Sequence, residues 1–102
     1  MSARSFDINK LNVKQSNIRV VVEDSSNCAI LHNTCIVAIN NFSVTLNSGG
    51  WRTTTTKVAI NRALSQYPRL KGYGIFQKKG QWFVSCPNNE ILEFVDGMSI
   101  NL

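Results

Sequence analysis

The alternation of apolar and polar residues along the chain predicts mainly β-strands. Phe42, Val44 and Leu46 alternate with polar residues, which is the period of a strand that buries one face. β-branched and other apolar runs predict further strands at residues 18–22, 29–31, 35–39, 73–77, 81–85, 90–95 and 98–102. Turn-forming residues separate these runs, so we expect antiparallel hairpins.

Three short turns are predicted to close hairpins. Asn40-Asn41 supplies two residues that tolerate positive φ, and the glycine of Lys78-Lys79-Gly80 suits the left-handed position of a three-residue loop. Asp96-Gly97 is a strong two-residue signal between the strands 90–95 and 98–102. In the last strand alternate residues, ending with Leu102, should face the core, and loss of a few terminal residues should destabilise the fold.

One segment has the period of a helix. Its apolar residues lie at steps of three and four on one face from about Thr54 onward: Ile60, Ala63, Leu64 and Tyr67. A threonine is a natural N-cap, and Pro68 should end the helix. We therefore predict an α+β fold of about seven to eight strands in antiparallel β-hairpins around one central α-helix.

The length of 102 residues and the apolar content of 43% fit a single domain, residues 1–102, in which 1–17 form a loosely ordered N-terminal segment. No apolar run is long enough to span a membrane, and the N-terminus lacks the apolar part of a signal peptide. We expect a cytoplasmic protein that needs no cofactor.

Candidate groups for enzyme chemistry are few. The three cysteines are an odd number without an export signal, so we expect free thiols. Cys28, His32, Cys35 and Cys86 do not follow a recognised zinc spacing, and the carboxylates are scattered. We expect no metal site and no enzyme. A small metal-dependent or cysteine hydrolase that uses His32 with a neighbouring thiol stays as a lesser alternative.

Charge is distributed unevenly around a net value of +5. The segment between Ser25 and Asn89 contains no carboxylate. It holds these cations: Arg52, Lys57, Arg62, Arg69, Lys71, Lys78 and Lys79. Such a field would attract phosphates or an acidic partner, although a solvated basic surface without a partner explains it equally well.

The segment from Ser48 to Lys57 joins a strand to the helix through two glycines and four threonines. Helix N-termini present unpaired N–H groups, glycines let a ligand approach the backbone, and Arg52 can grip a phosphate with two hydrogen bonds. The segment lacks the Walker A order, so we expect no nucleotide hydrolysis. The candidate ligand-binding residues are Gly50, Trp51, Arg52, Thr53, Thr54, Thr55, Thr56, Lys57, Asn61, Lys78 and Trp82. A tight turn and a helix cap are the structural alternative.

A second candidate surface is the later hairpin, which interleaves aromatic and basic residues: Tyr73, Phe76, Lys78, Lys79, Gln81 and Trp82. Aromatic residues among lysines on a sheet can stack and track single-stranded nucleic acid. The core interpretation is favoured, because Trp82 and Phe83 point to opposite faces and one of them must face inward.

Three stretches resemble small proteins of tailed bacteriophages: residues 30–37 (ILHNTCIV), 46–57 (LNSGGWRTTTTK) and 77–82 (QKKGQW). The resemblance implies a phage origin and a place in the host cytoplasm, and it assigns no site residues. We expect a binding protein that captures a phosphate-bearing ligand, either a nucleotide signal or nucleic acid, and so antagonises host defence. The alternative is an inhibitor that docks its basic face on an acidic host protein. Exposed edge strands also favour a homo-oligomer.

Overall fold

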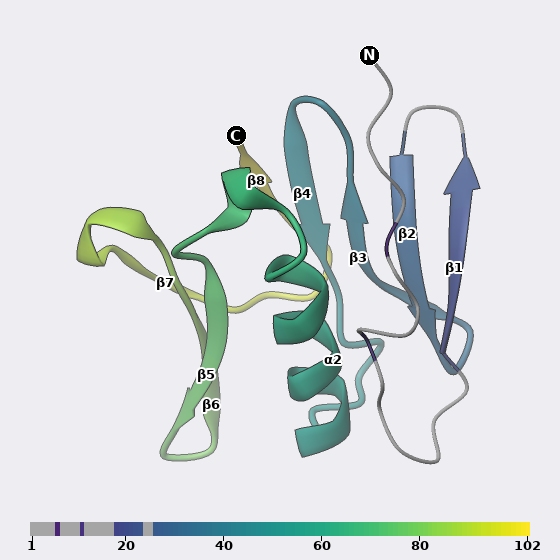
Figure 1. Cartoon of the computed structure of the whole chain (residues 1–102). Helices are drawn as coiled ribbons and strands as arrows, with labels where there is room; N and C mark the ends of the chain where they lie inside the picture. Colours follow the sequence, from purple (N-terminus) through teal and green to yellow (C-terminus); the bar gives the residue numbers. More distant parts are fainter. Residues whose placement is uncertain (1–5, 7–10, 12–17, 24–25) are drawn as a thin grey trace.

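The computed structural model describes residues 6, 11, 18–23 and 26–102, which form two antiparallel β-sheets and one α-helix (Figure 1). The predicted α+β class is confirmed. The expectation of a loosely ordered segment 1–17 lies largely outside the described residues. Within it, Phe6 and Leu11 are buried: Phe6 packs edge-on against the ring of Tyr67, and Arg62 donates to the carbonyl of Leu11 at 3.2 Å.

The larger sheet has five strands in the order β1-β2-β3-β4-β8. Their bounds are Ile18–Glu23 for β1, Ser26–Leu31 for β2, Thr34–Ile39 for β3, Ser43–Leu46 for β4 and Met98–Asn101 for β8. One face, built mostly from β-branched and leucine side chains, lies in the core. The predicted strands of the first half are present, although β2 begins earlier than predicted and β4 begins after Phe42.

The smaller sheet has three strands in the order β5-β6-β7. They are β5 (Gly74–Lys78), β6 (Gln81–Ser85) and β7 (Ile91–Glu93), with the 3-10 helices η1 (Pro68–Leu70) before β5 and η2 (Pro87–Asn89) before β7. The turn after β5 differs from the predicted three-residue loop. Lys78 pairs with Gln81, and only Lys79 and Gly80 form the loop, with φ of +54° and +79°.

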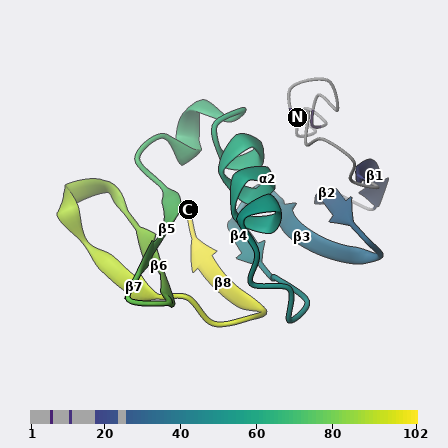
Figure 2. The same ribbon diagram turned by 90° about the horizontal axis from the view of Figure 1, so that it is seen from below.

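Helix α2 (Thr54–Leu64) lies between the two sheets and contacts β3 on one side and β5 on the other (Figures 1 and 2). Its buried residues are Thr56, Ala59, Ile60, Ala63 and Leu64. The helix ends before the predicted stop at Pro68. Tyr67 has the extended conformation that a following proline favours and is buried beside the helix rather than in it.

The sequence prediction for the turn between β3 and β4 is wrong in two respects. Neither Asn40 nor Asn41 has positive φ. Instead the Asn40 side chain accepts hydrogen bonds from the amides of Phe42 and Ser43, both at 2.8 Å, which closes the turn locally. Phe42 was assigned to the buried face, but it lies in this turn and is 77% exposed.

Asp96-Gly97 makes a tight turn but not a hairpin, which corrects another prediction. The amide of Met98 donates to the carbonyl of Val95 at 3.0 Å, as expected for such a turn. The two flanking strands nevertheless belong to different sheets, because β7 pairs with β6 and β8 pairs with β4. Met98 and Ile100 pack against the core as predicted, whereas Leu102 is 40% exposed.

Candidate functional site

The connection from β4 to α2 is shaped by its own turns and cap. The amide of Trp51 donates to the carbonyl of Ser48 at 3.0 Å, and Gly49 has φ of +65°. A Cβ atom on Gly49 would lie 2.4 Å from Oγ1 of Thr34, so the turn needs glycine there. Thr53 is the N-cap, and its hydroxyl accepts from the amide of Thr56 at 3.3 Å. Thr53 therefore acts as the helix cap that the structural alternative predicts.

Arg52 makes its interactions within the protein. Its Nε donates to Oγ of Ser48 at 3.1 Å, and its Nη2 lies 3.7 Å from a carboxylate oxygen of Asp96. The guanidinium also lies over the rings of Phe94 and Trp82, with Cζ 4.7 and 5.4 Å from their centroids. A phosphate at the helix start would have to compete with all of these partners.

Asp96 binds both Ser48 and Arg52 at this corner between β4 and α2. Its carboxylate accepts from the amide of Ser48 at 2.7 Å and from the hydroxyl of Ser48 at 2.6 Å. Partial burial alone would raise the pKa of Asp96, but these two hydrogen bonds and the charge of Arg52 outweigh it and lower the pKa from its ordinary value. The carboxylate of Asp96 therefore already binds the hydrogen-bond donors of Ser48 and the charge of Arg52 that an external phosphate would need.

Two more of the predicted residues have structural positions. The Asn61 side chain accepts from the amide of Ile75 at 2.7 Å and donates to the carbonyl of Ile75 at 3.0 Å, so it joins α2 to β5. Trp82 is 1% exposed and packs edge-on against Phe94 in the core. The idea that Trp82 stacks a base is wrong, because its ring does not reach the surface.

The remaining predicted residues range from exposed to buried. Trp51 is 60% exposed. Gly50, Thr54 and Lys78 are exposed, Thr55 and Lys57 are half-buried, and Thr56 is buried with its hydroxyl 3.2 Å from that of Thr53. Lys57 donates from Nζ to Oε1 of Gln77 at 3.3 Å, which places it beside the end of β5.

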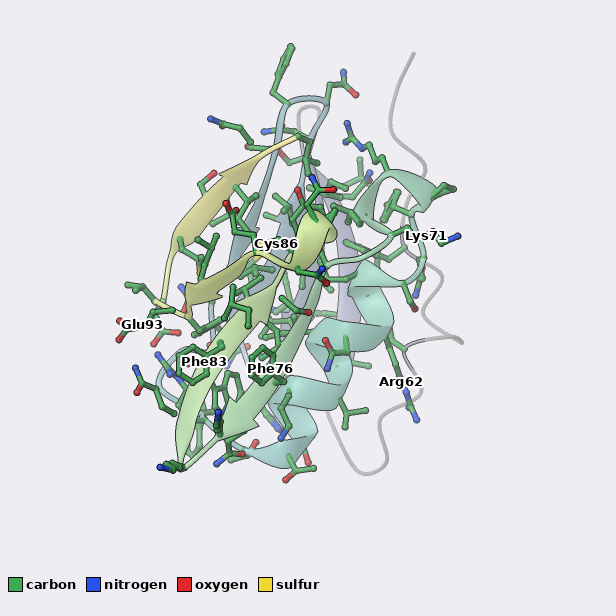
Figure 3. The ribbon with its side chains drawn as sticks, turned by 90° about the vertical axis from the view of Figure 1, so that its left-hand side faces the viewer. Arg62, Lys71, Phe76, Phe83, Cys86 and Glu93 are labelled. Carbon is green, nitrogen blue, oxygen red and sulfur yellow. The ribbon has the colours of Figure 1, made fainter. Side chains whose placement is uncertain are left out.

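The outer face of the smaller sheet carries an aromatic pair. Phe76 and Phe83 are directly opposite in the register of β5 and β6, and their rings are nearly parallel, with centroids 5.5 Å apart and an interplanar angle of 23°. Figure 3 looks at this face and shows both rings on it, seen close to face-on. Both side chains are half-buried, so each ring keeps part of its surface open to solvent.

Charged and polar residues surround the pair. Lys78 and Gln81 are opposite each other at the same face, next to the exposed Lys79 of the turn. On the other side, Glu93 is opposite Phe83, and it accepts from Nε2 of Gln81 at 2.9 Å. Ile91 extends the apolar surface and is 59% exposed. We call Phe76, Phe83 and Lys78 the aromatic platform.

The family model of the Kyanoviridae Gp96 protein matches residues 3–101 of this chain. The chain belongs to the Kyanoviridae Gp96 family. The resemblance to small tailed-phage proteins is thereby confirmed at the level of the family. Comparisons with curated proteins and with solved structures found no match.

In this Gp96-family chain the described residues bring no metal site together: no three His, Cys, Asp or Glu side chains among them form a cluster. The chain turns at His32-Asn33, where both residues have positive φ, between β2 and β3. Cys86 is buried, and this burial, with the nearby charge of Glu90, raises the pKa of its thiol. No described helix of the Gp96-family chain is long and apolar enough to cross a membrane.

The platform was only partly visible in the sequence. The sequence predicts Phe76 and Lys78 as binding residues, but it indicates for Phe83 only that its face opposes that of Trp82. The alternation of faces in β6 carries the missing signal. Once Trp82 is the inward residue, Phe83 must point outward next to Phe76.

Proposed function

We propose that this phage protein binds single-stranded nucleic acid on the aromatic platform. The observation that carries the proposal is the outward pair Phe76 and Phe83 beside Lys78. Bases would stack on the ring faces, and the lysine would contact the phosphate backbone. In known sheet-based RNA-binding modules, aromatic residues on the open face of a sheet stack two or three bases in this way.

Lys79 supports a path for the backbone beside Lys78, and Lys57 adds positive charge at the same end of the sheet. Lys79 follows Lys78 in the turn, whereas Lys57 bonds to Gln77, which is opposite the inward Trp82 and so belongs to the other face of β5 from Phe76. All three belong to the carboxylate-free stretch of the sequence, so the positive field around this end of the sheet comes from several residues. Glu93 opposes it from the other side of Phe83, and its repulsion should limit the affinity.

The helix start supports an anion less well than the platform does. The guanidinium of Arg52 is engaged with Ser48, Asp96 and two rings, and the Thr53 hydroxyl caps the helix. A ligand there would displace internal contacts, whereas a base on the platform would cover ring surface that water now covers. We propose the host cytoplasm as the place of action, where covering nucleic acid would antagonise host defence.

Fluorescence anisotropy with labelled DNA and RNA oligonucleotides at low salt tests the proposal. We expect Phe76→Leu to weaken binding roughly 5- to 150-fold, because stacking on an aromatic side chain contributes about 1–3 kcal/mol per base. Phe76→Tyr keeps a ring of similar size and should bind nearly as well as the wild type. Glu93→Gln should bind more tightly, and Lys78→Gln should reduce the salt dependence by about one counterion.

Trp51→Leu is the matched control, because Trp51 is another exposed aromatic residue but lies at the helix start. It should leave the affinity unchanged. Binding that is lost in Trp51→Leu and kept in Phe76→Leu would move the site to the helix start. Absence of binding to every oligonucleotide would overturn the proposal, and a host protein retained from nuclease-treated lysate would then favour the inhibitor alternative.

A further inference from the structure

We propose that two copies of this chain associate by antiparallel pairing of strand β8 with its equivalent, which would join the two larger sheets into one continuous sheet. This inference concerns a different surface from the aromatic platform. It rests on the exposed edges of the described sheets, on the direction of the backbone groups of β8, and on the distribution of charge.

The edges of the two described sheets differ in how they are protected. β1 carries the exposed Arg19, and β7 contains Glu93 and follows Glu90. The edge of β5 is covered by α2, since Asn61 uses both the amide and the carbonyl of Ile75. Charges and covering elements are the usual means by which proteins prevent pairing between edges.

β8 has neither form of protection. Its sequence, Met98-Ser99-Ile100-Asn101, contains no charged residue and no proline. In Figure 3, which looks from the left-hand side of Figure 1, the yellow strand β8 runs along the rim of the molecule with no ribbon in front of it. Exposed apolar residues flank the strand: Phe42 is next to it in the neighbouring turn, and Leu102 follows it.

The register shows which backbone groups of β8 are open. The amide of Leu102 donates to the carbonyl of Phe42 at 2.8 Å, which marks this position as a hydrogen-bonded pair. Pairs alternate in an antiparallel ladder, so Ile100 also bonds to β4 while Ser99 and Asn101 direct their N–H and C=O groups away from it. These groups form the template for a further strand.

A second copy is the occupant that this edge fits. Antiparallel pairing about a two-fold axis places β8 opposite the same uncharged strand, so that the pairing is self-complementary. Each copy carries a net charge of +5, and an uncharged edge is where two such copies can approach with least repulsion. An acidic partner, by contrast, would gain nothing from β8. Because one strand pair forms a small interface, we expect a concentration-dependent dimer.

Sedimentation velocity over a range of protein concentrations tests the inference, with Asn101→Pro and Asn101→Ala as a matched pair. Proline removes the outward N–H of Asn101 without removing a bond to β4, and edge strands tolerate it. We expect the wild type and Asn101→Ala to dimerise at high concentration and Asn101→Pro to stay monomeric. Ser99→Lys, which places like charges at the shared edge, should also be monomeric if the proline variant does not fold.

The salt dependence distinguishes dimerisation through β8 from the proposed binding of nucleic acid. Screening of the like charges should strengthen the dimer at high salt, whereas nucleic-acid binding should weaken. Asn101→Pro should still bind oligonucleotides, and Phe76→Leu should still dimerise. A wild-type protein that stays monomeric at all concentrations and salt levels would overturn the inference, as would a folded Asn101→Pro that dimerises like the wild type.

Discussion

Individual side chains decide how the two halves of the chain are joined. Ser48, which lies two residues after β4, is 1% exposed, and Asp96 contacts it from the connection between β7 and β8. Arg52 completes the corner with its ion pair to Asp96. From the sequence, Asp96 was a turn residue and Arg52 a phosphate ligand. Neither role could reveal their contact, because it depends on strands that are far apart in the sequence.

Asp96 should make stability depend on pH. Its pKa is lowered in the folded protein, so the carboxylate stabilises the fold above the ordinary aspartate pKa of about 3.9, and this contribution is lost as pH falls through the folded-state pKa. We expect Asp96→Asn to unfold at lower urea concentration at pH 7, with a loss of about 1–3 kcal/mol. The difference from the wild type should close at acid pH. A gap that persists below pH 2 would contradict this role.

At the scale of the elements, local patterns predicted most of the fold. The alternation in residues 42–46 and the apolar runs gave strands close to the observed bounds, and the glycine turn after β5 joined the expected pair. Asp96-Gly97 failed as a hairpin because a turn signal describes only the residues of the turn. Which sheet each flanking strand joins depends on Phe94, which is buried in the core, and on the edge of β4 with which β8 pairs.

The join between α2 and β5 gives a test at this scale. Asn61 is one of the predicted ligand residues, but it pairs with the backbone of Ile75 through both its oxygen and its nitrogen. We expect Asn61→Ala to lower the free energy of unfolding by about 1–3 kcal/mol, because it leaves a part-buried amide and carbonyl without partners. Thermal unfolding measures this, with Ser65→Ala on the exposed side of the helix end as the control.

The fold of the whole molecule depends on strand β8. It follows the three strands of the smaller sheet in the sequence and completes the larger sheet. Ending the chain after Gly97 should lower the free energy of unfolding by roughly 2–4 kcal/mol, because the half-buried Met98 and Ile100 and the bonds to β4 are lost. Chemical denaturation of the shortened chain measures the effect. Removal of Leu102 alone, which is 40% exposed, should cost much less because Met98, Ile100 and the strand pairing are kept.

The position of β8 has a consequence for synthesis on the ribosome. β4 is made early, yet its second neighbour comes from residues 98–101, so one side of β4 has no partner while the helix and the smaller sheet are being translated. Native topology can be reached only when that distant segment has emerged. Such long-range closure is slow compared with the formation of a local hairpin. The nascent chain therefore carries a strand with one open edge for about half of its elongation, and we expect chaperones to bind it during that time.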